Sequence, residues 1–242
     1  MNCRAVMVLA LVICLSPWPA PALGQACPDP LQGARRLVLV TADTMETYTA
    51  TAQLFERAAA ADAWRSLGPA EPALLGRTGM AWGHGFHHLR KDGEPAKVEG
   101  DKRTPAGIYR IGQSFGFNAS EQPGYIKITE DTICVDDPRS PAYNTITSRT
   151  AVGARVHREI MHTNPRYRKG LVVNYPTDAA AKAGSCIFIH VHRSPTSPTL
   201  GCVALPEARV AALQEFAGPG AVLAVLPKAA LGQLSGCLPQ VN

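Results

Sequence analysis

The sequence predicts a mainly β protein, a sandwich or barrel-like domain with one or two short helices. Short segments rich in β-branched and aromatic residues recur through the 242-residue chain, and turn-forming Gly and Pro separate them. One segment, residues 206–216, has the pattern of a helix: a first-turn Pro, an early Glu and a Gly-Pro-Gly stop. Many strands with few helices are typical of all-β sandwiches and barrels.

The strands are expected in the following order along the chain. Apolar and Thr residues alternate at 36–41 and 47–56, which predicts the first two strands. Pieces rich in Ala and Pro at 59–63 and 69–75 are interpreted as connections, and a Gly-rich segment around Trp82 follows. Residues 104–111 are interpreted as a turn that feeds a strand, and later strands are predicted at 125–129, 132–135, 170–175, 186–192, 202–205 and 221–226.

The N-terminus predicts an exported protein. Residues 1–24 carry a single positive charge, Arg4, and an apolar run too short to span a bilayer. Prolines break this run, and small residues then fit signal-peptidase cleavage after Gly24. A lipoprotein signal that ends at Cys27 is the alternative.

The remaining chain is expected to form one domain. No internal repeat or long linker interrupts residues 35–227, which are preceded by an extension at 25–34 and followed by a C-terminal tail at 228–242. No other segment has transmembrane length, so we expect no stable membrane insertion after cleavage. The net charge of +5 is scattered along the chain, so nucleic acid is not an expected partner.

The cysteines predict two disulfides and one free thiol. An odd number of cysteines follows the predicted cleavage site: Cys27, Cys134, Cys186, Cys202 and Cys237. An oxidising compartment favours pairing of all but one of them. Cys27 and Cys237 lie near the two ends of the mature chain, and Cys134 and Cys186 lie in apolar runs that could pair in a sheet. We therefore predict these two pairs and a free Cys202, although sequence alone does not settle the connectivity.

The predicted strand at 186–192 places two histidines on one face. Alternation puts His190 and His192 on the same side as Cys186 and Phe188. Two prolines break the following segment, so it is expected to loop out and fold Cys202 back toward His190.

A thiol beside an imidazole is a pattern of nucleophilic catalysis. The imidazole increases the reactive thiolate fraction, and Gly201 permits a tight turn whose backbone N–H groups receive an oxyanion. Cys202 is therefore a candidate nucleophile. A buried structural cysteine beside a core histidine is the alternative.

Four segments occur in a consistent order over nearly the whole mature chain. They are DKRTPAGIY at 101–109, CVDDPRSPAYN at 134–144, GSCIFIH at 184–190 and PTLGC at 198–202. Together they resemble the L,D-transpeptidase catalytic domain family, the YkuD-like enzymes of bacterial cell walls, in its exported proteobacterial branch. The resemblance implies a YkuD-like β-sandwich in the periplasm of a Gram-negative cell envelope, with neither metal nor organic cofactor.

The resemblance also implies roles for individual residues. Cys202 would be the nucleophile and His190 the general base and acid, and the backbone of Gly201 would contribute to the oxyanion hole. Thr199 stands where the family usually has Ser or Thr, and it would orient the loop or bind substrate.

The sequence departs from the usual family pattern on both sides of the cysteine. Leu200 replaces a common His, and Ala204 replaces an Arg or Asn that usually contacts a substrate carboxylate. Arg193, in the same loop, is the candidate to replace that contact, and a solvated loop charge is the alternative. His192 and Trp82 are the other candidates for substrate binding. His192 could instead orient His190 or have neither role, and a buried core tryptophan is the alternative for Trp82.

The implied reaction is acyl transfer between peptidoglycan stem peptides. A donor stem acylates Cys202, and an acceptor amine then forms a crosslink; 3-3 and 1-3 crosslinks and protein attachment all stay open. An L,D-carboxypeptidase or an amidase of the same fold is the second hypothesis. Two further alternatives are a non-catalytic wall-binding protein and a metal-dependent hydrolase, the latter with a site formed by His84, His87, His190 and His192.

Overall fold

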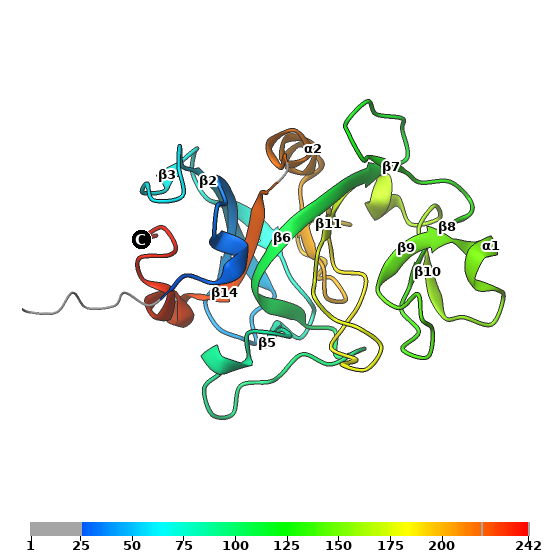
Figure 1. Cartoon of the computed structure of the whole chain (residues 1–242), viewed down its shortest axis with the longest axis horizontal. Coiled ribbons are helices and arrows are strands. Elements are labelled where there is room, and N and C mark those ends of the chain that lie inside the picture. Colours follow the sequence, from blue (N-terminus) through cyan, green and yellow to red (C-terminus); the bar gives the residue numbers. More distant parts are fainter. Residues whose placement is uncertain (1–25, 219, 242) are drawn as a thin grey trace, which may run out of the picture.

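The largest sheet of the molecule closes on itself (Figure 1). The computed structural model describes residues 26–218 and 220–241, so the predicted signal peptide lies outside the described residues. The strands of this sheet are β1 (Arg36–Ala42), β2 (Thr49–Glu56), β3 (Arg65–Ser66), β4 (Glu71–Leu74), β5 (Met80–Trp82), β6 (Thr104–Gly116), β7 (Ile126–Lys127), β11 (Lys169–Val173), β12 (Phe188–Val191), β13 (Val203–Leu205) and β14 (Val222–Pro227).

The strand order explains the closure. The strands are hydrogen-bonded in the order β1-β14-β6-β11-β12-β13-β4-β2, and β2 pairs again with β1. Most neighbours are antiparallel, whereas β1 with β14 and β12 with β13 are parallel. The prediction of a mainly β sandwich or barrel-like fold is confirmed.

A second, smaller sheet lies at the end of the molecule opposite the C-terminus (Figure 1). It contains β8 (Thr132–Val135), β9 (Thr145–Ser148) and β10 (Arg158–Ile160), with β8 in the centre, and α1 (Arg149–Val152) follows β9. The disulfide between Cys134 and Cys186 joins this small sheet to the segment before β12. Both predicted disulfides are present, because Cys27 is bonded to Cys237.

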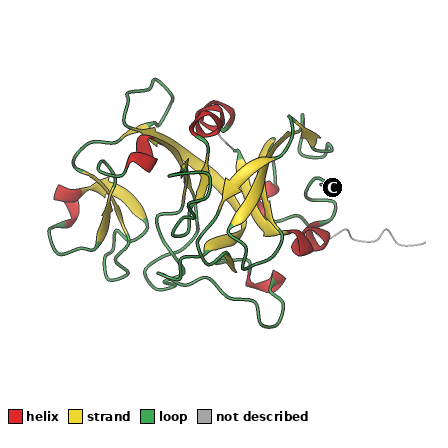
Figure 2. Ribbon diagram, turned by 180° about the vertical axis from the view of Figure 1, so that it is seen from behind, coloured by secondary structure: helices red, strands yellow, loops and turns green. Residues whose placement is uncertain are grey.

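The predicted helix is present as α2 (Glu207–Phe216), which packs against β11 and β12 (Figure 2). Its buried side chains, Val210 and Leu213, lie about one turn apart and face the sheet. Four 3₁₀ turns complete the described elements: η1 (Asp29–Leu31), η2 (His87–Leu89), η3 (Pro165–Arg168) and η4 (Lys228–Leu234).

The predicted alternation in β12 is confirmed. Ile187, Ile189 and Val191 belong to the main core, whereas Phe188 packs on the other side. The Phe188 ring contacts Phe115 edge-on, with centroids 5.2 Å apart. Burial of each such side chain stabilises the fold by about 1.5–3 kcal/mol. Because the two faces of β12 serve two different clusters, this strand fixes the position of His190 relative to both sheets.

Several predicted boundaries were wrong. β12 begins at Phe188 because Cys186 has a left-handed backbone with φ of +54° and ends the extended run. The predicted connection at 69–75 contains β4, and β5, β9 and β10 were not predicted. β5 has only three residues beside glycines, so no alternation is visible there. Residues 228–241 include η4 and contribute Leu234 to the main core.

Among the residues that the structure describes, no helix combines the length and the apolar character needed to cross a membrane.

Candidate active site

The candidate nucleophile lies in a pocket of about 410 Å³ where the two sheets meet. The small-sheet side contributes the segment around Glu159, and a loop that contains Lys97 forms another wall. This Cys202 pocket is lined by Lys97, Glu99, Gly100, Lys102, Asp136, His157, Arg158, Glu159, Arg166, Tyr167, Ser185, Cys186, Ile187, His190, Leu200, Gly201 and Cys202. The structure thus brings together Cys202, His190 and Gly201, which the sequence singled out.

Cys202 is placed by the parallel pairing of β12 with β13. The register sets Ile189 opposite Val203, so Cys202 comes beside Phe188 just before β13 begins. Its Sγ accepts a hydrogen bond from the Phe188 N–H at 3.4 Å and donates to the Cys186 carbonyl at 3.5 Å. Cys202 is the free cysteine of the described residues, as predicted, and it is 9% exposed.

His190 is held in one orientation and one tautomer. Its Nδ1 lies 2.9 Å from the Val191 carbonyl, which can only accept, so Nδ1 donates and Nε2 carries the lone pair of the neutral ring. The Tyr167 ring packs edge-on against the imidazole with centroids 5.5 Å apart. A buried imidazole with a free Nε2 lone pair is suited to accept a proton.

Burial keeps both groups neutral. It raises the pKa of the Cys202 thiol to about 12, and the negative charge of Glu159 adds to this effect. Burial also lowers the pKa of His190 to about 4, with smaller contributions from Arg166 and His192. The sequence reasoning predicted a thiol activated by a neighbouring imidazole; in the structure, desolvation outweighs that effect. The resting pair is therefore a neutral thiol and a neutral imidazole rather than a thiolate–imidazolium pair.

This charge state predicts the pH dependence of Cys202 alkylation. Because only the thiolate reacts and its pKa is about 12, the rate with iodoacetamide should rise about tenfold per pH unit between pH 6 and pH 10. The unfolded chain should level off above about pH 9, near the ordinary thiol pKa. Mass spectrometry of the Cys202 peptide measures both rates. A plateau near neutral pH in the folded protein would indicate an ion pair and contradict this interpretation.

The loop before Cys202 is held by Thr199. The Thr199 Oγ1 donates to the Cys202 carbonyl at 2.7 Å and accepts from the Gly201 N–H at 3.0 Å. This differs from the prediction for Gly201, because its N–H is engaged within the loop rather than free for an oxyanion. Gly201 is needed for its backbone instead: its φ is +143°, and an added Cβ would lie 3.2 Å from the Arg103 carbonyl.

Thr199→Val is expected to lower the free energy of unfolding by about 1–3 kcal/mol, because it leaves the buried Gly201 N–H without its acceptor. Urea denaturation measures this change. Thr196→Val is the matched control, since Thr196 is exposed in the same loop. Equal stability of the two variants would contradict the role assigned to Thr199.

The other predicted substrate-binding residues lie outside the Cys202 pocket. Trp82 is 1% exposed in the main core and donates from Nε1 to Glu94 at 2.6 Å. Thr199 is buried in its loop and does not line the pocket. His192 and Arg193 line a neighbouring pocket, which also contains Arg166.

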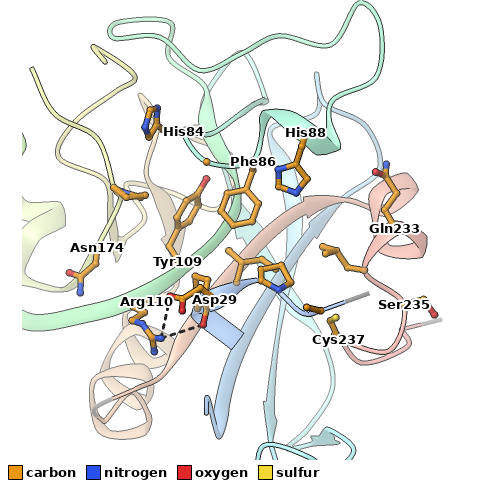
Figure 3. A pocket seen from close by; sticks show the side chains of 17 residues that line it. Asp29, His84, Phe86, His88, Tyr109, Arg110, Asn174, Gln233, Ser235 and Cys237 are labelled. Carbon is orange, nitrogen blue, oxygen red and sulfur yellow. Dashed lines mark hydrogen bonds and ion pairs between the residues drawn. The ribbon is translucent and has the colours of Figure 1, made fainter. Parts of the chain in front are cut away.

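The His84 region lines a different, largely apolar cavity of about 530 Å³ (Figure 3). His84, Phe86 and His88 line it together with Tyr109 (Figure 3). The histidines of the predicted metal alternative are thus divided between separate places. Within the described residues, no three His, Cys, Asp or Glu side chains are grouped as metal ligands.

Glu159, Arg166 and Tyr167 are among the residues of the Cys202 pocket that sequence reasoning missed. Burial raises the pKa of Glu159, to which Asn164 donates from Nδ2 at 3.3 Å. Arg166 and Tyr167 come from η3, a turn of four residues. No sequence motif identifies these residues, because their side chains reach the pocket only through contacts between segments that are distant in the sequence.

The comparisons with known proteins agree with this geometry. The family model described as YkuD, L,D-transpeptidase catalytic domain, matches residues 70–225, which is more than half of the chain and includes both His190 and Cys202. Searches of curated proteins and of solved structures gave no match.

Proposed function

Because the chain belongs to the YkuD family of L,D-transpeptidase catalytic domains, a family that acts on peptidoglycan, we propose that it crosslinks stem peptides through a thioester on Cys202. The observation that carries this proposal is the shared pocket of a free thiol and an imidazole whose Nε2 is unprotonated. Cys202 and His190 are the residues that would perform the reaction.

The first half of the reaction forms the acyl-enzyme. As the Cys202 Sγ attacks the donor carbonyl between an L-centre and a D-residue, the thiol proton passes to the His190 Nε2. A neutral pair suits this step, since a thiol with a raised pKa needs a base at the moment of attack. The imidazolium then protonates the leaving amine, and a thioester remains.

The second half transfers the acyl group. His190 is again neutral, so it removes a proton from the incoming acceptor amine as that amine attacks the thioester. The C–S bond breaks and the imidazolium returns this proton to the departing Cys202 Sγ, so the products are the crosslinked peptide and the regenerated thiol. Water in place of the amine gives L,D-carboxypeptidase activity.

The backbone N–H of Cys202 is the donor we propose for the oxyanion. Gly201 N–H is bound to Thr199, whereas the Cys202 N–H donates to no other residue of the described chain. Removal of one oxyanion donor typically costs about 2.7–4 kcal/mol of transition-state stabilisation.

The location proposed for this activity is the periplasm. Two disulfides and a peptidoglycan-acting family both fit an extracytoplasmic protein. We also propose residues 35–227 as the catalytic domain, which includes every strand from β1 to β14.

The decisive experiment offers a defined muropeptide donor with and without an acceptor and detects the products by mass spectrometry. A crosslinked dimer that requires the acceptor supports the transpeptidase. Release of the terminal residue without any dimer would replace it with the hydrolase. Unchanged activity in Cys202→Ala would contradict both.

A further inference from the structure

Arg166 lies in the wall between two pockets. It lines the Cys202 pocket and also a neighbouring pocket of about 460 Å³, the Arg193 pocket. The Arg193 pocket is lined by Thr163, Asn164, Pro165, Arg166, Arg168, His192 and Arg193. It contains three arginines and no Asp or Glu, so its lining favours an anionic group.

The guanidinium of Arg166 is available to such a group. Its Nε donates to Asn164 Oδ1 at 2.9 Å, which fixes the side chain on η3, and its positive charge opposes the rise in the pKa of Glu159 in the same pocket. Arg168, by contrast, forms an ion pair with Glu207 at 2.7 Å. No carboxylate of the described chain lies within 4 Å of the Arg166 guanidinium. The second nitrogen pair of the guanidinium fork can therefore receive a planar anion in a bidentate manner.

The course of the chain from His190 to His192 places the positive charge of Arg166 near the amine that exchanges a proton with His190. His190 lines the Cys202 pocket, and His192, two residues further along on the same face, lines the Arg193 pocket. Arg166 lines the same pocket as the reacting pair, and its positive charge lowers the pKa of both His190 and Cys202, so a leaving amine beside His190 lies near this guanidinium. The leaving D-residue carries its terminal carboxylate on the same carbon as that amine.

We infer that Arg166 is a specificity-determining residue that binds the terminal carboxylate of the D-residue released from the donor. The inference rests on the proposed function and assigns to Arg166 the contact that the sequence suggested for Arg193. Arg193 is exposed at the outer side of the second pocket and does not reach the Cys202 pocket. Ala204 provides no competing contact, because its side chain ends at Cβ.

The test compares two tetrapeptide donors that differ only in the terminal D-residue, one with a free carboxylate and one with a carboxamide. The rate of acylation is measured by intact-mass spectrometry. The kcat/KM for acylation should be at least about tenfold higher with the carboxylate donor, as expected for a charge-assisted contact. Arg166→Gln should remove this preference by slowing only the carboxylate donor. Arg166→Lys should keep part of the preference because it keeps the charge.

Arg155→Gln is the matched control, since Arg155 is exposed and lines neither pocket. It should keep both rates. Equal wild-type rates with the two donors, or a preference that survives Arg166→Gln, would overturn the inference while acylation itself upholds the proposed function.

A binding measurement separates the two claims when no acylation occurs. Calorimetry with the Cys202→Ala protein and the same two tetrapeptides should show about tenfold tighter binding of the carboxylate form, and Arg166→Gln in that background should abolish the difference. Equal affinities would overturn the role of Arg166 whatever the activity of the enzyme.

Discussion

His190→Ala is expected to lower kcat/KM for acyl transfer by about 10²–10⁴-fold, the range that a positioned general acid and base contributes. The thiol of Cys202 has a pKa of about 12, so without the imidazole almost no thiolate forms at neutral pH. The same imidazole protonates the leaving amine. Both halves of the reaction should therefore slow, and neither substrate binding nor the disulfides should change.

The measurement is the rate of acyl-enzyme formation by quenched intact mass, with thermal unfolding to show that the variant is folded. His88→Gln is the control, because His88 lines the apolar cavity of Figure 3 rather than the Cys202 pocket. A His190→Ala protein that acylates within about threefold of the wild-type rate would exclude His190 as the base, since general acid–base catalysis contributes far more than that.

Removal of the Cys134–Cys186 disulfide is expected to reduce both stability and activity. The bond closes a separation of 52 residues, for which chain entropy predicts a loss of about 4 kcal/mol. The activity should fall as well, because the Cys186 carbonyl accepts the hydrogen bond from the Cys202 thiol and Cys186 lines the pocket. The Cys186 backbone, with φ of +54°, is held by this bond and by the Asn144 side chain at 3.0 Å.

The Cys27–Cys237 disulfide provides the matched control. Its separation of 210 residues predicts a larger stability loss, about 5 kcal/mol, but it lies by the apolar cavity and away from Cys202. The paired Cys→Ala variants are compared by denaturant unfolding and by acylation rate at a temperature where both are folded. If both variants lose activity equally, Cys134–Cys186 has no specific role at the site.

The nucleophile and its base were predictable because their signal is local. The alternation of β12 sets the face of His190, and the odd number of cysteines left Cys202 as the free thiol. The two residues lie on one strand and on the short loop that follows it, so their placement could be expected from the local sequence. The protonation states were not predictable, because they depend on burial by segments far away in the sequence, such as η3 with Tyr167.

Most of the residues that surround Cys202 and His190 could not be predicted from the sequence. Trp82 suggested a cleft but is a buried core residue. The sequence did not distinguish the two, because aromatic residues beside glycines occur both in clefts and in cores. Arg193 suggested a carboxylate contact through its place in the loop, whereas Arg166 reaches the pocket from η3. Only the pairing of strands in the two sheets determines which of these side chains meet the thiol.

The thioester mechanism is tested most directly by the intact mass of the protein after exposure to tetrapeptide muropeptides. We expect an acyl adduct of the donor, less its terminal residue, located on Cys202 and lost in Cys202→Ala. A protein that releases the terminal residue but never carries an adduct, or that carries it on another residue, would contradict the thioester mechanism.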